Sequence, residues 1–241
     1  ADRALQFIID RMWLDKRLFA TCKDGRAHLA AYLDDYVFLI DAILELLQLR
    51  WNSNDLAFAI QLADVTLDHF SAPGGGFYFT ADDHETLIQR PRPFNDDALP
   101  AGNAIAAKVF GRLGHLLGET RYLDAAEGTP KAASPAIQQS PYGHTGLLLA
   151  LEETLKPITT VVIRGGPELA EWQQAFNRYY QPDRQVFGIP NDAVELPGLL
   201  SERQPTDGAI AYVCSGMSCQ PPITDLSQLT GSTLQGTRHE H

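Results

Sequence analysis

The stretch from 28 to 49 constrains the fold most, because apolar side chains cover most of its helical circumference. One stripe at helical spacing consists of Leu29, Leu33, Tyr36, Ile40, Ile43 and Leu47, and a second of Leu39, Ala42, Leu46 and Leu49. Only a narrow polar edge remains, formed by Asp34, Asp41, Glu45 and Gln48. A helix that is apolar nearly all round is buried by other helices. We therefore predict an inner helix over residues 28–49.

Helical spacing continues through most of the first 156 residues. Further helices are predicted at about 1–13, 55–70, 101–117, 120–127 and 143–155. The 55–70 segment has one main apolar stripe, as expected of an outer helix. Alternation of inner and outer helices is what a toroid of helical hairpins requires. Gly118 should end the fourth helix, and residues 128–141, rich in Pro, Ala, Ser and Gln, are predicted to form a loop.

Two regions have the composition of strands. Residues 74–90 place aromatic and β-branched runs on either side of a polar turn, which predicts a β-hairpin. After Pro157 the pattern predicts strands near 158–163, 185–189 and 209–213, with a helix at 167–179. We therefore expect a mainly α fold with a hairpin and a small α/β C-terminal segment. The predicted division is 1–156, 157–230 and a tail at 231–241.

The net charge of the 241-residue chain is −11, which argues against a broad nucleic-acid or anionic-membrane surface. No apolar run reaches the roughly 18 residues of a membrane span. The chain starts without methionine, inside a helical pattern and without a signal peptide. We expect it to be part of a longer protein. Apolar faces exposed at its first helices would then favour homo-association.

The cysteines and histidines predict neither a cofactor nor a metal. Three cysteines are too few for a disulfide scaffold and suit a reducing compartment, so we expect the cytoplasm. Cys214 and Cys219 have four residues between them, unlike the two of a redox CxxC. A structural turn is the favoured interpretation there, and reversible oxidation is the weaker alternative. None of the seven histidines has the spacing of a zinc motif.

The stretch Arg90–Asn103 holds two arginines, two adjacent aspartates and three prolines directly before a predicted helix. Proline fixes φ and disfavours helix before itself, so this loop should be stiff and should deliver charges to a helix N-terminus. Arg90 and Asp96 could serve a ligand, or could pair with each other and hold the loop. Asp35 should lie at the buried end of an apolar stripe, either as a cavity-facing acid or as a structural carboxylate.

Four motifs together resemble one known family. They are Leu33-Asp34-Asp35-Tyr36, the run Gly75-Gly-Phe-Tyr-Phe-Thr80, the Arg90–Asn103 stretch, and Ala211-Tyr-Val-Cys214 with Cys219 and Pro222-Ile-Thr-Asp225. The family comprises YyaL-type proteins and spermatogenesis-associated protein 20. These join an N-terminal thioredoxin-like domain to a six-hairpin-glycosidase-like (α/α) toroid. Asp97 stands where the motif has glycine, which directs attention to Asp96, and Ala101 replaces the motif serine.

The resemblance implies that this chain is a partial (α/α) toroid that lacks the thioredoxin-like domain. Related toroids include sugar epimerases and glycosidases, so a carbohydrate-like ligand in the central cavity is the first functional hypothesis. Asp35 and Asp96 would act as proton donor and acceptor, with Arg90, Asn103 and Tyr36 binding the ligand. The alternative is a non-enzymatic scaffold that supports the absent domain, with these aspartates paired inside the protein.

Overall fold

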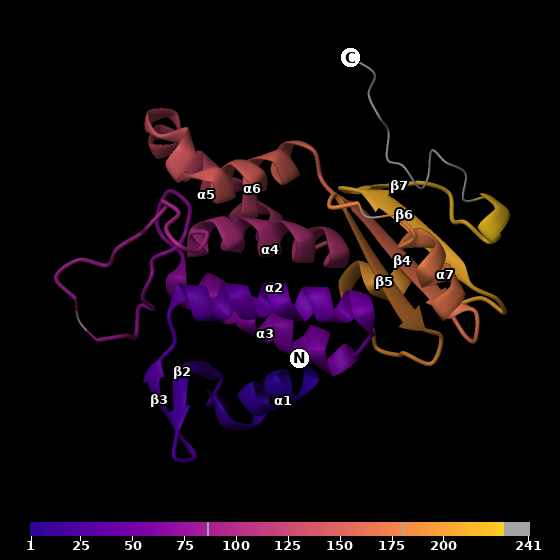
Figure 1. The fold of residues 1–241 in the computed structure, drawn as a ribbon, viewed down its shortest axis with the longest axis horizontal. Coiled ribbons are helices and arrows are strands. Elements are labelled where there is room, and N and C mark those ends of the chain that lie inside the picture. Colours follow the sequence, from indigo (N-terminus) through magenta and orange to yellow (C-terminus); the bar gives the residue numbers. More distant parts are fainter. Residues whose placement is uncertain (86, 180, 229–241) are drawn as a thin grey trace.

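Helices α2 (Leu33–Leu49) and α4 (Gly102–Leu117) lie side by side at the centre of the molecule (Figure 1). This is a computed structural model, and it describes residues 1–85, 87–179 and 181–228. Helix α3 (Ser53–Phe70) packs against α2, whose Ile40, Ile43 and Leu47 are fully buried. The prediction of a buried inner helix from its all-round apolar pattern is confirmed. The predicted tail, 231–241, lies outside the described residues.

The predicted start of the inner helix at residue 28 is wrong. After α1 (Asp2–Arg11), the chain forms an antiparallel three-stranded sheet of β1 (Trp13–Leu14), β2 (Arg17–Lys23) and β3 (Arg26–Ala30). Leu29 therefore lies in a strand and is largely exposed. Helix α2 begins at Leu33, because the Asp35 carboxylate accepts a hydrogen bond from the backbone N–H of Tyr32 and caps the first turn.

The predicted loop at 128–141 is mostly helical. Helix α5 (Thr120–Gln139) continues through Pro130 and Pro135, and α6 (Thr145–Leu155) follows after a short 3₁₀ turn (Pro141–Gly143). The composition of this segment predicts a loop, but burial stabilises the helix, because Ala133 and Ile137 pack with Ala104 in an apolar cluster. As predicted, α4 ends at Gly118, which takes a left-handed conformation with φ 70°.

The predicted hairpin over residues 74–90 is also wrong. Its described residues form turns and bends, apart from one isolated bridge between Ser71 and Phe77. Gly75 has φ +99°, and a Cβ there would lie 2.4 Å from the carbonyl oxygen of Gly128. The glycine run therefore permits close backbone contact with α5. Phe77 follows it into the core and stacks on Phe110, with ring centroids 5.3 Å apart.

The C-terminal part contains the predicted strand–helix–strand unit, in which β4 (Thr159–Gly165) and β5 (Arg184–Pro190) are parallel and joined through α7 (Leu169–Phe176). Two antiparallel strands, β6 (Ile210–Ser215) and β7 (Ser218–Cys219), complete a sheet of order β5-β4-β6-β7. Short 3₁₀ turns occur at Gly198–Glu202 and Leu226–Gln228.

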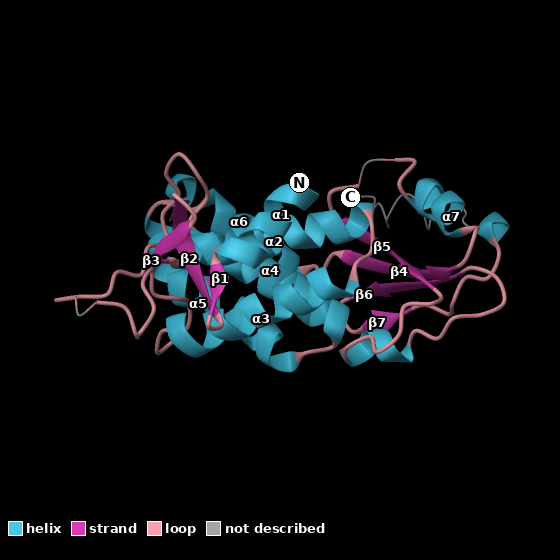
Figure 2. Ribbon diagram, turned by 90° about the horizontal axis from the view of Figure 1, so that it is seen from below, coloured by secondary structure: helices cyan, strands magenta, loops and turns pink. Residues whose placement is uncertain are grey.

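The sheet packs on both faces. One face carries α7, while Val162 and Phe187 on the other join the core of the helices (Figure 2). The described fold is therefore mainly α, with two small sheets. Among the described helices, none is both long and apolar enough to cross a membrane.

The two prolines inside α5 generate a stability prediction. Pro135 is exposed and has no N–H to donate to the carbonyl of Lys131. Replacing it with alanine should raise the free energy of unfolding by about 1–3 kcal/mol, measured by urea denaturation. The neighbouring Ser134→Ala, which leaves the backbone donors unchanged, is the control. Equal or lower stability of Pro135→Ala would contradict a helical backbone at this position.

Candidate functional site

The Asp96 carboxylate ties the charged loop to the first turns of two helices. Its Oδ1 accepts a hydrogen bond from the Ala101 amide at 2.9 Å. Its Oδ2 accepts from the Thr145 hydroxyl at 2.9 Å and from the Gly146 amide at 2.8 Å. Partial burial alone would raise the pKa of Asp96, but these hydrogen bonds together hold it below its usual value. Asp96 is thus an anionic structural clamp between α4 and α6, poorly suited to donate a proton.

Asp35 is exposed, so its predicted burial is wrong. The later start of α2 places Asp35 in the first helical turn, where its side chain folds back to cap Tyr32. Its neighbour Asp34, assigned to the solvated edge of the helix by its pattern, is the half-buried acid. Burial, aided by the charge of Asp35, raises the pKa of Asp34. Desolvation raises the pKa of Asp35 too, although the hydrogen bond from Tyr32 opposes it. A Cβ on Gly102, the first residue of α4, would lie 2.0 Å from Asp34 Oδ1.

The arginines of the loop bind the protein backbone. Arg90 donates to the carbonyl oxygens of Thr80 and His69, and its guanidinium lies 4.2 Å from the ring centroid of Tyr78. Arg92 donates to the carbonyl of Gly75 at 2.7 Å. Pairing of Arg90 with Asp96 is not observed, because each is occupied by other partners. Both arginines therefore hold the loop in place.

Asn103 and Tyr36 are core residues. Asn103 is fully buried; it accepts from the Phe77 amide at 2.7 Å and donates to the carbonyls of Phe77 and Pro93 at 2.9 Å each. The hydroxyl of Tyr36, which is 1% exposed, accepts from the Leu18 amide at 2.9 Å. These contacts are structural, and the residues predicted to form the site do not converge on one cavity.

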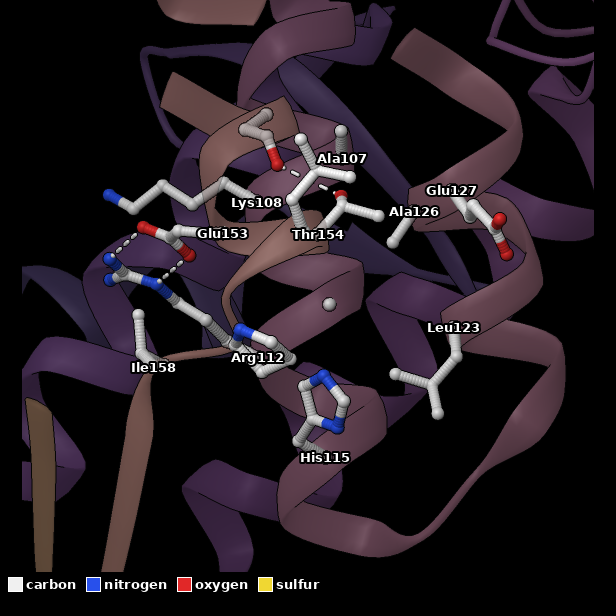
Figure 3. Close-up of a pocket in the computed structure, with 14 residues that line it drawn as sticks. Ala107, Lys108, Arg112, His115, Leu123, Ala126, Glu127, Glu153, Thr154 and Ile158 are labelled. Carbon is white, nitrogen blue, oxygen red and sulfur yellow. Dashed lines mark hydrogen bonds and ion pairs between the residues drawn. The ribbon is translucent and has the colours of Figure 1, made fainter. Parts of the chain in front are cut away.

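Lys108 and Arg112, on α4, instead line three adjoining hollows in the described part of the chain. One hollow, of about 280 Å³, lies between α4, α5 and α6 and has Ala107 and Ala126 in its wall (Figure 3). A second, of about 450 Å³, extends along α6 to Pro182. The third, of about 510 Å³, lies between α2, α4 and β5.

The two cations shared by these hollows are each paired with a carboxylate. Arg112 is 8% exposed, and its Nε and Nη2 donate to the two carboxylate oxygens of Glu153 at 3.0 and 2.7 Å. The amine of Lys108 lies 3.0 Å from Asp41 on α2. Burial lowers the pKa of His115, so its ring is neutral at pH 7. The walls are thus polar without a strong excess of either charge.

Gln185 of β5 is the exceptional residue in the third hollow. It is 2% exposed, yet neither its Oε1 nor its Nε2 has a hydrogen-bond partner among the described residues. Its register partner Thr160 is also buried, with a hydroxyl that finds no partner in the same described region. Buried polar groups are rarely left unpaired, and each such case calls for an explanation. In the sequence, the only indication of this residue is a glutamine within a predicted strand.

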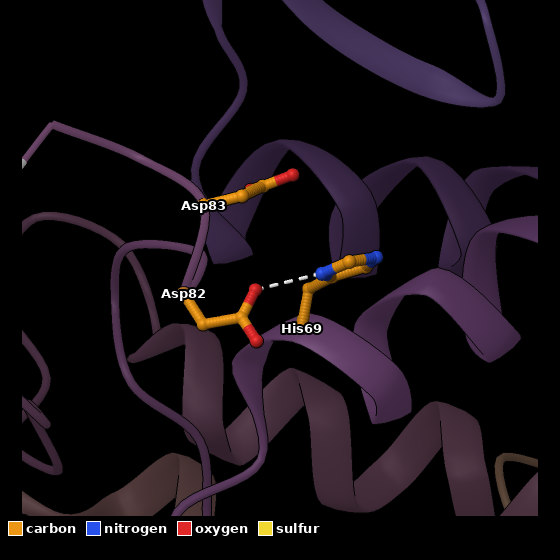
Figure 4. A group of neighbouring side chains, drawn as sticks. All are labelled: His69, Asp82 and Asp83. Carbon is orange, nitrogen blue, oxygen red and sulfur yellow. Dashed lines mark hydrogen bonds and ion pairs between the residues drawn. The ribbon is translucent and has the colours of Figure 1, made fainter.

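His69, Asp82 and Asp83 form a group whose possible metal-ligand atoms lie within 4.8 Å of one another (Figure 4). Histidine spacing does not reveal this group, because the aspartates lie in a separate loop. His69 Nδ1 is 2.7 Å from Asp82 Oδ1, and Asp83 is paired with Arg17. The hydrogen bond from His69 lowers the pKa of Asp82. The His69–Asp82 hydrogen bond and the Asp83–Arg17 ion pair account for the cluster, and we assign no metal to it.

Comparison with known proteins shows which proteins the chain is similar to. No protein-family model matches it. It is 26% identical over 208 residues to mouse spermatogenesis-associated protein 20, and 27% identical over 231 residues to the human protein. These matches cover 82% and 88% of this chain. An uncharacterised protein of Caenorhabditis elegans, B0495.5, is 25% identical over 86% of the chain.

These similarities confirm the resemblance to spermatogenesis-associated protein 20 that the four motifs indicate. The chain spans only 26–29% of the length of the curated relatives it matches.

Replacing Asp96 with asparagine should lower the free energy of unfolding at pH 7 by about 1–3 kcal/mol, because an amide group cannot accept all three hydrogen bonds. The pKa of Asp96 is lowered in the folded protein, so its stabilisation is full above the unfolded value near 3.9 and is lost as the pH falls through the folded value. The difference in free energy of unfolding between the wild type and Asp96→Asn, measured by chemical denaturation, should therefore become smaller below about pH 4.

Asp97→Asn is the matched control, since Asp97 is adjacent, exposed and outside the network. Equal losses in the two variants, or a gap that is independent of pH, would contradict a clamp by ionised Asp96.

Proposed function

We propose that this chain binds a small, polyhydroxylated, carbohydrate-like molecule in the hollows around Lys108 and Arg112. The observation that carries the proposal is the unpartnered amide of Gln185, buried at the wall of the 510 Å³ hollow. Its carbonyl can accept and its amino group can donate a hydrogen bond. A hydroxyl group both donates and accepts, so two neighbouring hydroxyls would satisfy both ends of this amide.

The paired charges of the hollows suit the same ligand. A neutral polyol needs hydrogen-bond partners and gains little from a strong local field. The pairs Arg112–Glu153 and Lys108–Asp41 offer polar atoms while their charges balance. Guanidinium N–H groups can donate further hydrogen bonds to hydroxyl oxygens, and carboxylate oxygens can accept them from hydroxyl groups. Alanines in the α4–α5 wall offer an apolar surface against which C–H groups of a ring can pack.

A toroid architecture would place these hollows in a common central cavity. We propose that α2, α4 and α6 are inner helices of a partial (α/α) six-hairpin toroid, with α3 and α5 outside. In this arrangement the polar edges of α2 and α4 face the same space. The ion pair between Lys108 of α4 and Asp41 of α2 supports this orientation. The carbohydrate class of the ligand follows from this analogy of fold, together with the chemistry of the wall.

We propose binding without assigning a reaction. Asp96 accepts three hydrogen bonds within the protein, and Asp35 caps its own helix at the surface. Neither residue lines the three hollows. An acid–base pair for glycoside chemistry needs two carboxyl groups that flank the substrate. The described geometry offers no such role to this pair.

The second candidate is a scaffold for the remainder of a longer protein, such as a thioredoxin-like domain. It is favoured by the loop from Arg90 to Asn103, whose conspicuous polar side chains are satisfied within the chain. The two candidates differ in what they require of Gln185. A scaffold role alone does not explain why the buried amide of Gln185 has no partner beside a hollow.

Gln185→Met separates the candidates, because it keeps the length of the side chain and removes both polar atoms. The variant should unfold at the same or a higher temperature, since an unpaired buried amide is costly. It should also lose the rise in melting temperature that sugars and polyols give to the wild type. Differential scanning calorimetry with a panel of monosaccharides and polyols measures both effects.

The exposed Gln139 on α5 provides the matched control, and Gln139→Met should retain the response to sugar. If no member of the panel stabilises the wild type, or if Gln185→Met responds as the wild type does, the binding proposal is wrong and the scaffold is favoured.

A further inference from the structure

Cys214 and Cys219 form a disulfide at the edge of the C-terminal sheet. The two residues lie directly opposite each other in the antiparallel pair β6–β7, and β7 is the outermost strand. Cys219 is exposed, whereas Cys214 is 8% exposed. Gly216, with φ +56°, lies in the tight turn between them. One sulfur is therefore open to an incoming reagent, and its partner is shielded.

Arg203 places a positive charge against both sulfurs. Its Nη2 is 3.2 Å from Cys219 Sγ and 3.5 Å from Cys214 Sγ. The guanidinium also lies 5.0 Å from the ring centroid of Tyr212, and the Arg203 carbonyl accepts a hydrogen bond from Arg164 at 2.8 Å. No carboxylate in the described ranges forms an ion pair with Arg203. Its charge is thus available to the sulfur atoms.

A neutral disulfide gains little from a neighbouring cation, but a thiolate gains a great deal. A nearby arginine lowers the pKa of a cysteine thiol and so favours the reduced, ionised form. A better stabilised leaving thiolate also departs faster in thiol–disulfide exchange. The position of Arg203 is therefore best explained by chemistry in which the disulfide opens.

We propose that Cys214 and Cys219 form a reversible thiol–disulfide exchange site for a dithiol reductant, in which Arg203 stabilises the sulfur that leaves. This inference is independent of ligand binding in the helical hollows. A thiolate of the reductant attacks the exposed Sγ of Cys219, the Cys214–Cys219 bond breaks, and Cys214 leaves as a thiolate beside Arg203.

The second thiol of the reductant then completes the exchange. Its thiolate attacks the reductant's own sulfur in the mixed disulfide and releases Cys219 as a thiolate. The reductant becomes a disulfide, and the protein gains two electrons and two protons as a dithiol. Cys22, the free cysteine of β2, takes no part.

A redox titration of the folded chain tests the proposal. The protein is equilibrated in buffers of reduced and oxidised dithiothreitol at pH 7, alkylated, and analysed by mass spectrometry. The wild type should show a two-electron transition at Cys214 and Cys219, while Cys22 is alkylated throughout. In Arg203→Met the equilibrium should move at least threefold toward the disulfide, and the alkylation of reduced Cys214 should shift to higher pH.

Two further variants isolate the effect of charge. Arg203→Lys keeps the cation and should restore most of the wild-type equilibrium. Arg178→Met removes an exposed arginine that lies over Tyr179, in the way that Arg203 lies over Tyr212. This variant should change neither the redox equilibrium nor the pH dependence of alkylation.

Resistance of the wild-type disulfide to excess dithiothreitol under native conditions would overturn the proposal, even if Arg203→Met did not fold. An unchanged equilibrium and pH profile in folded Arg203→Met would overturn it equally.

Discussion

Close packing around α4 is the constraint on which the rest of the structure depends. Helices α2, α5 and α6 all contact α4, and small residues make this approach possible. A Cβ at Gly114 would lie 2.7 Å from a methyl carbon of Leu123, so larger residues would push α5 away. The long polar side chains of α4 do not allow an equally close approach. Lys108 and Arg112 therefore meet the carboxylates of α2 and α6, and hollows remain around them.

The most conspicuous charges in the sequence serve to hold this frame together. Asp96 joins the first turns of α4 and α6, while Arg90 and Arg92 bind backbone carbonyls of the glycine-rich region and its flanks. A stiff, proline-rich loop with several charges suggests a ligand-binding site. In this protein its charges hold neighbouring segments together. The groups best suited to bind a ligand lie elsewhere, and Gln185 is outside every motif that the sequence presents.

The sequence predicts the parts of the fold whose structure is determined by local patterns of residues. Helices α2, α3 and α4 follow from periodicity, and the β4–α7–β5 unit follows from strand and turn signals. The three-stranded sheet before α2 and the second half of α5 depend on distant packing, which overrides the local signals of Pro130 and Pro135. Gln185 lies on β5 beside α2, where the adjacent Val186 amide donates to the side chain of Gln48, 138 positions away. No local pattern shows that contact.

The side-chain amide of Gln185 offers the most direct test of a ligand site at the centre of the protein. Its NH₂ resonances can be followed by ¹H–¹⁵N NMR while a stabilising sugar is added. If a sugar binds there, these resonances should move in a saturable manner while those of the exposed Gln139 stay fixed. Gln185 resonances that do not respond to any sugar, or that shift no more than those of Gln139, would contradict the proposed site.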